Sequence, residues 1–342
     1  MNFQNAYKVY KLRDWVPLDK IDFMTIAFNP LAIDLIETHI EKIYDTSLLF
    51  NNNNAKHIVE KLFNISEYNE VCWQAISSSE EYATFIEENF QYIINSWMFL
   101  SRYQFGKNPG IVHLMENFIK RDFHPQCVLD LLDGLFQNPN PKVIPIIEKY
   151  MNRITPDMFL QNVYQSPHLH YFIDKGIVSM NQDVINNMDD SNKRLLSSNS
   201  CNKIIMLLDN NQKLIDWPSL CMNKNPRAIK IIEKNLHKLD SKCWSLLSIN
   251  QNAIHILENN VEKVNWDALL YNQNAGHLLD QRQNIETIDW ESFSANPAMF
   301  EVDYNYLKQR MKNTFAEELI ANRFHPKNMD KWFSWGFDEN MV

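Results

Sequence analysis

Residues 216–235 read DWPSLCMNKNPRAIKIIEKN and residues 240–260 read DSKCWSLLSINQNAIHILENN, so one order of residue types occurs twice in succession. Each stretch has a Trp, then Leu three residues later, then Asn three residues further on. A second segment follows in which Ala and two larger apolar residues recur at helical spacing before a Glu. Side chains three or four residues apart lie on one side of a helix. Each stretch therefore predicts two short helices joined by an Asn-rich turn.

The ends of these helices have their own signals. Asp216 and Asp289 precede a Trp, where a carboxylate accepts a free backbone N–H and starts a helix. Pro218 suits the first helical turn because its missing N–H is not needed there. Four Asn residues and one Gly follow the second helices, where a left-handed residue commonly ends a helix, namely Asn89, Asn211, Asn235, Asn260 and Gly176.

The second helix recurs along most of the chain as two apolar residues followed by an acid. This acid column comprises Glu37, Glu60, Glu87, Glu116, Glu148, Asp174, Asp209, Glu233, Glu258 and Asp280. The intervals, about 22–35 residues, are typical of stacked supersecondary units. Helices this short are marginal in water unless neighbouring repeats bury them.

These observations predict an all-α fold, an α-solenoid of stacked short helix-turn-helix repeats of about 22–35 residues. The product is expected to be an elongated superhelix without a sheet, because no segment shows sustained alternation. The solenoid should cover residues 1–302, degenerate in 1–70 and 120–200 and regular in 210–302. A C-terminal helical cap should cover residues 303–342, because the repeat pattern stops there and a solenoid needs a polar end.

Composition limits the partners. The net charge of −9 argues against a nucleic-acid partner held through its phosphates. No apolar run approaches the length needed to span a membrane. The five cysteines show no CxxC spacing, which indicates buried free thiols in a reducing compartment.

Three columns of equivalent residues are candidates for function. The acid column is either a ladder of carboxylates that meets a basic partner or a structural feature. In the structural interpretation, which we favour, each acid pairs with a nearby Lys, as with Glu37 and Lys42, or caps an adjacent repeat. Histidines three residues before the acid are interpreted as solvent-facing rather than as metal ligands, since equivalent positions lie about 10 Å apart: His57, His113, His255 and His277. The Trp column is interpreted as repeat core rather than as a base-stacking surface, and comprises Trp73, Trp97, Trp217, Trp244, Trp266 and Trp290.

No glycine-rich nucleotide loop, nucleophile elbow or HExxH motif occurs in the sequence. We therefore expect no enzyme activity, no catalytic residue, no cofactor and no metal.

The run from Asp216 to Asn296, with its DWxxLxxN and NxAIxIIExN elements, and the tail Glu317–Pro326 resemble short helical-repeat proteins of unknown function from the large DNA viruses of amoebae and algae. The resemblance implies a non-enzymatic scaffold or adaptor that binds a host or viral protein in the host cytoplasm. A structural or packaged component of the virion is the alternative, and a helical-repeat RNA-binding protein is the less favoured third reading.

Overall fold

The computed structural model describes residues 9–62, 68, 70–90, 102–120, 125–281, 287–312, 321, 325–328 and 331. Helices account for 72 % of it and strands for 2 %, which confirms the prediction of a mainly helical chain. The chain divides into two compact bodies. The main body is Pro17–Ala298, and the terminal body joins Met1–Val16 to Met299–Val342.

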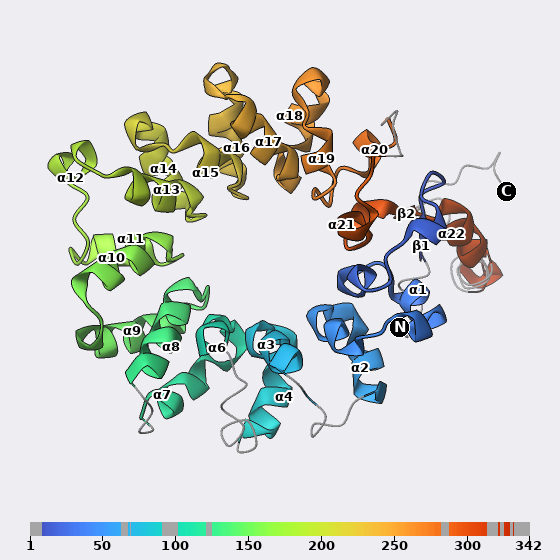
Figure 1. The fold of residues 1–342 in the computed structure, drawn as a ribbon, viewed down its shortest axis with the longest axis horizontal. Helices are drawn as coiled ribbons and strands as arrows, with labels where there is room; N and C mark the ends of the chain where they lie inside the picture. Colours follow the sequence, from blue (N-terminus) through green and yellow to red (C-terminus); the bar gives the residue numbers. More distant parts are fainter. Residues whose placement is uncertain are drawn as a thin grey trace. The chain divides into compact units, whose positions relative to one another are not determined.

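The main body contains a row of first helices, one for each repeat of the sequence (Figure 1). From η4 to α19, each helix of this row contacts the next one. The apolar residue three positions after the Trp is fully buried in this row, as at Leu220, Leu247 and Phe293. The row comprises the 3₁₀ helices η4 (Thr25–Phe28) and η6 (Thr46–Asn51), then α3 (Glu70–Ser78), α6 (Arg102–Lys107), α8 (Pro125–Gln137), α10 (Pro156–Gln165), α13 (Asp190–Ser198), α15 (Trp217–Cys221), α17 (Ser241–Ile249), α19 (Trp266–Leu269) and α21 (Trp290–Ser294).

A second helix follows each first helix from η4 to α19, and these second helices carry the acid column, with Asp280 just after the last of them. Asp216 starts α15 by accepting from the Ser219 N–H, and Asp289 starts α21 by accepting from the Ser292 N–H, as predicted. The widest interval of the acid column holds an additional helix, α12 (Gln182–Asn186). The second helices are α1 (Ile33–Thr38), α2 (Lys56–Leu62), α4 (Ala83–Glu88), α7 (Val112–Lys120), α9 (Ile144–Tyr150), α11 (Leu169–Asp174), α14 (Asn202–Asn210), α16 (Pro226–Glu233), α18 (Ile254–Glu258) and α20 (Gly276–Leu279).

A buried asparagine between the two helices of a repeat bonds that repeat to the one before it. Asn250 donates from Nδ2 to the carbonyls of Cys221 (2.7 Å) and Asn223 (2.9 Å), and its Oδ1 accepts from the Asn252 N–H (3.0 Å). An amide side chain offers two donors and an acceptor, and the last carbonyls of a helix need donors. One Asn thus satisfies the end of the preceding first helix and fixes its own turn.

We call these residues the asparagine ladder. The paired donations recur at Asn29, Asn52, Asn108, Asn138, Asn199, Asn223, Asn250 and Asn272, and Asn296 donates to the Leu270 carbonyl. Two repeats have Ser79 and Ser166 at this position. In the second of them, His168 donates from Nε2 to the Asn138 carbonyl at 3.0 Å, so a different side chain supplies the missing bond.

The ladder joins the first repeat of the main body to the last. Asn29 donates to the carbonyls of Ser294 (3.0 Å) and Asn296 (2.9 Å). The Asp22 N–H donates to Ser294 Oγ (2.9 Å), and η4 contacts α21. These are the bonds that link neighbouring repeats elsewhere. The expectation of an elongated superhelix is therefore wrong for the main body, whose first and last repeats contact each other.

The asparagines that follow the second helices do not take the predicted left-handed conformation. Gly176 has a φ of 71°, but no described non-glycine residue has a positive φ. Instead, each Asn side chain donates to the carbonyl four residues earlier, as Asn235 does to Ile231 (2.8 Å) and Asn260 to Ile256 (2.8 Å). The side-chain amide thus replaces the backbone cap and avoids the strain of a left-handed residue.

The terminal body contains a small antiparallel sheet, so the prediction of no sheet is wrong. Strand β1 (Tyr10–Leu12) pairs with β2 (Phe300–Val302), with Lys11 opposite Glu301. The Lys11 ammonium lies 2.9 Å from the Glu301 carboxylate. Strands of three residues are too short for alternation to be visible in sequence.

Helix α22 (Tyr304–Arg310) follows in the terminal body and starts at Asp303, which accepts from the Tyr306 N–H. Residues 1–16 group with 299–342, whereas the sequence had placed the domain boundary at 302/303. The aromatic residues of the predicted cap, Trp332, Phe333 and Trp335, lie outside the described residues.

Candidate functional site

The acid column lies on the second helices, where its carboxylates contact the next repeat. Glu37 accepts from His57 Nε2 (2.9 Å), Glu233 from His255 Nε2 (2.6 Å) and Glu116 from Lys149 Nζ (3.2 Å). The same kind of contact joins Glu87 to His113, Glu148 to the Tyr171 hydroxyl, Asp174 to Lys203 and Glu258 to His277. The acid and histidine columns therefore form one set of contacts between repeats.

These contacts lie at the surface. Glu60, at the end of α2, and Asp280, just after α20, are likewise exposed. Hydrogen bonds from Lys120 and Lys149 hold the pKa of Glu116 below its usual range, and a hydrogen bond from Lys203 does the same for Asp174. Exposed ion pairs contribute about 0–1 kcal/mol each. The contacts therefore add little to the free energy of unfolding, and their main effect is to fix the position of each repeat against the next.

The lysines that follow Glu37, Glu233 and Glu258 by five residues have a different partner from the one expected. The Lys42 ammonium lies 4.6 Å from the centre of the Phe23 ring, Lys238 lies 5.0 Å from Trp217, and Lys263 lies 4.9 Å from Trp244. A cation at this distance from an aromatic face is attracted by the ring. These lysines cover the aromatic residue of their own repeat.

The Trp column is only partly buried. Trp73 and Trp244 are 3 % and 6 % exposed, whereas Trp217, Trp266 and Trp290 are half-buried at the first residue of their helices. Trp97 lies outside the described residues. The fully buried position of the first helix is the apolar residue three positions later, as at Ile76 and Leu269.

A groove of about 420 Å³ opens along the first helices α13, α15 and α17, and we call it the Met222 groove. Met222 is 53 % exposed there and lies beside Pro218 and Leu246. The carboxylates of Asp190 and Asp216 and the cations of Arg194 and Lys242 also line the groove. The full lining is Asp190, Arg194, Asp216, Pro218, Ser219, Met222, Lys242 and Leu246.

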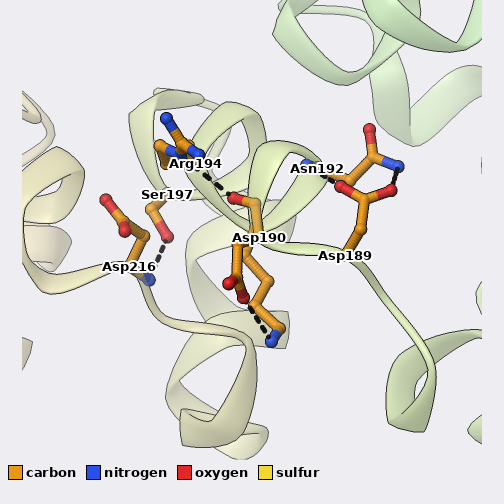
Figure 2. Close-up of polar contacts among 7 residues, drawn as sticks. Asp189, Asp190, Asn192, Arg194, Ser197 and Asp216 are labelled. Atoms are coloured by element: carbon orange, nitrogen blue, oxygen red, sulfur yellow. Dashed lines mark hydrogen bonds and ion pairs between the residues drawn. The ribbon is translucent and has the colours of Figure 1, made fainter.

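Figure 2 shows the polar contacts of three lining residues, Asp190, Arg194 and Asp216. Asp190 lies 3.0 Å from the Lys193 ammonium, which holds the pKa of Asp190 below its usual range. Arg194 Nε donates to the Asp190 carbonyl (3.3 Å). Asp216 donates its backbone N–H to Ser197 Oγ (2.9 Å) and accepts from the Ser219 N–H (3.0 Å). Both carboxylates thus have fixed partners, and their negative charges border the apolar part of the groove.

Sequence reasoning missed the residues of this groove, although one signal was available. Met222 stands directly before a ladder asparagine, and the same position holds Phe28 (40 % exposed) and Tyr271 (54 % exposed). An apolar residue before a repeated buried Asn could have been recognised as surface, because it lies beyond the end of the helix. Arg194 and Lys242 follow no periodic pattern.

The cysteines are free thiols. Cys221 and Cys243 are buried on the neighbouring helices α15 and α17, and burial raises the pKa of both thiols. Among the described residues, no group of three or more His, Cys, Asp or Glu side chains could hold a metal ion. Within the same ranges, none of the helices has the length and apolar character of a membrane span.

Comparison with protein-family models, with curated protein sequences and with solved structures finds no match for this chain.

Proposed function

We propose that the chain is a non-enzymatic, protein-binding scaffold built as an α-solenoid of short helix-turn-helix repeats. The repeating contacts between first helices and the asparagine ladder support this architecture. Solenoids expose an extended row of equivalent positions, which suits them to bind other proteins. The Met222 groove is the docking site that we assign to the row of first helices.

The observation that carries the proposal is an open groove lined by both apolar and charged side chains. Met222 and Leu246 supply apolar surface, and Asp190, Arg194 and Lys242 supply charges in the same lining. Protein interfaces combine apolar contacts with polar and charged ones.

Affinity purification with the tagged full chain and quantitative mass spectrometry tests the proposal. Met222→Asp places a charge in the centre of the groove and should release a protein that wild type retains. Leu62→Asp is the matched control, since Leu62 is 45 % exposed on α2 and lies outside the groove. The proposal is wrong if wild type enriches no protein over the tag alone, or if the Met222 variant retains every partner.

A further inference from the structure

The junction between α14 and α16 lacks the contact between repeats that joins Glu233 to His255 at the next junction. Asp209 of α14 and Lys230 of α16 occupy the positions at which Glu233 contacts His255 in the next repeat. Here the two residues line opposite sides of a groove of about 260 Å³, which we call the Lys230 groove. Within the described part of the chain, no ion pair joins Asp209 to Lys230.

The Lys230 groove carries an excess of positive charge. Arg227, Lys230 and Lys234 lie along one edge of α16, since residues three or four apart share a helix face. All three are exposed, and none forms an ion pair with a described residue. Asp209 is the acid in the lining, so three cations and one anion give a local charge of +2. The whole chain has a net charge of −9, so this groove is a local exception.

The floor of the groove is apolar. Ile205 and Ile231 are 1 % and 2 % exposed, and Met206 beside them is 50 % exposed. Methionine is flexible and polarisable, so it adapts to apolar side chains of different shapes. The groove thus combines an apolar contact with cations along one side.

We propose that the Lys230 groove binds an acidic segment of a protein, and this rests on the proposed function as a protein-binding scaffold. Carboxylates of the segment pair with Arg227, Lys230 and Lys234, and an apolar side chain packs on Met206. Asp209, on the opposite side, accepts backbone N–H groups of the segment. Charge complementarity of this kind selects partners and speeds their association.

A protein segment suits this groove better than a nucleic acid. Phosphate backbones are held by extended basic surfaces, and their affinity depends on many neutralised phosphates. Met206 and the isoleucine floor have no partner on a phosphate backbone, whereas a peptide carries apolar side chains between its acids.

The test selects phage-displayed random peptides on the immobilised full chain and measures the enriched peptides by fluorescence anisotropy. We expect acidic residues next to an apolar residue in the enriched peptides. Lys230→Glu with Lys234→Glu should weaken their binding by about 100-fold, since attraction becomes repulsion. Asp209→Asn should strengthen it by about threefold, because it removes the one opposing charge. Lys61→Glu with Lys142→Glu, two exposed lysines elsewhere, is the charge-matched control and should change binding by less than about twofold.

Circular dichroism and urea unfolding of each variant establish that it is folded. The inference is overturned if the enriched peptides are not acidic, or if the α16 variant binds them like wild type. A single-stranded oligonucleotide that displaces the peptides and requires Lys230 would also overturn it. If the peptides depend on Met222 but not on α16, the proposed function stands and this inference falls. If no peptide is enriched, this inference falls, and the affinity purification with the Met222 variant alone decides the proposed function.

Discussion

Removal of one ladder amide tests whether the asparagines hold the repeats together. Asn250 is 5 % exposed and makes three side-chain hydrogen bonds, to Cys221, Asn223 and Asn252. A hydrogen bond contributes about 1 kcal/mol net, and a buried polar group left without a partner costs about 1–3 kcal/mol. Asn250→Ala should therefore lower the free energy of unfolding by about 3–5 kcal/mol.

Two further variants calibrate this value. Asn250→Ser should cost less than the alanine variant, because a serine hydroxyl can still accept the N–H two residues on, as Ser166 does from His168 (3.2 Å). Asn259→Ala is the control: Asn259 is exposed, and its side chain donates only to the His255 carbonyl of its own helix. It should cost less than about 0.5 kcal/mol.

Urea unfolding followed by tryptophan fluorescence provides the measurement, since Trp244 lies in the same repeat as Asn250. The reasoning is refuted if Asn250→Ala and Asn259→Ala destabilise the protein equally. It is also refuted if the serine variant is less stable than the alanine variant.

Three other expectations follow from burial. Trp244→Ala should cost about 3–5 kcal/mol in urea unfolding, and Trp266→Ala clearly less, because Trp244 is 6 % exposed and Trp266 is half-buried; equal costs would contradict this. Burial lowers the pKa of His168 despite its bond to the Asn138 carbonyl, so the unfolded chain binds this proton more readily. The free energy of unfolding should then fall as the pH drops below about 6.5, and His168→Asn should remove that part of the slope, measured as the difference between the two proteins in urea unfolding at each pH. Cys221 and Cys243 should resist a thiol reagent in the native protein and react in guanidinium, because burial keeps them as thiols; labelling of the native protein at the rate of an exposed cysteine would show otherwise.

The sequence predicted the helices well because their signals are local. Asp216 begins α15 through a bond to Ser219, three residues away, and such a contact can be inferred from spacing alone. The role of Asn250 could not be inferred in the same way, because its acceptors lie 27 and 29 residues earlier in the preceding repeat. Asn at the end of a helix has local roles that explain its presence. The sequence alone therefore did not indicate that Asn250 also donates hydrogen bonds to the preceding repeat.

The candidate sites were less predictable than the helices. The contact between Glu233 and His255 spans 22 residues, and that between Glu116 and Lys149 spans 33, so no single offset reveals it. The two grooves depend on which side chains remain exposed after the helices pack. Met222 and Met206 resemble core residues in composition, and only the packed structure distinguishes them. Contact between the first and last repeats depends on the accumulated rotation of all the junctions, which no motif encodes.

The bonds of Asn29 to Ser294 and Asn296 bear on how such a gene can change. An open array of repeats lengthens or shortens by duplication or deletion, since each added copy stacks on a free end. In this main body the first and last repeats are already bonded to each other, so neither end is free to stack on an added repeat. An extra copy, or one copy fewer, would shift the last repeat away from the first and break their shared hydrogen bonds. Copy number is therefore held constant by the fold itself, and variation should accumulate within repeats, at exposed positions such as Met222, instead of in their number.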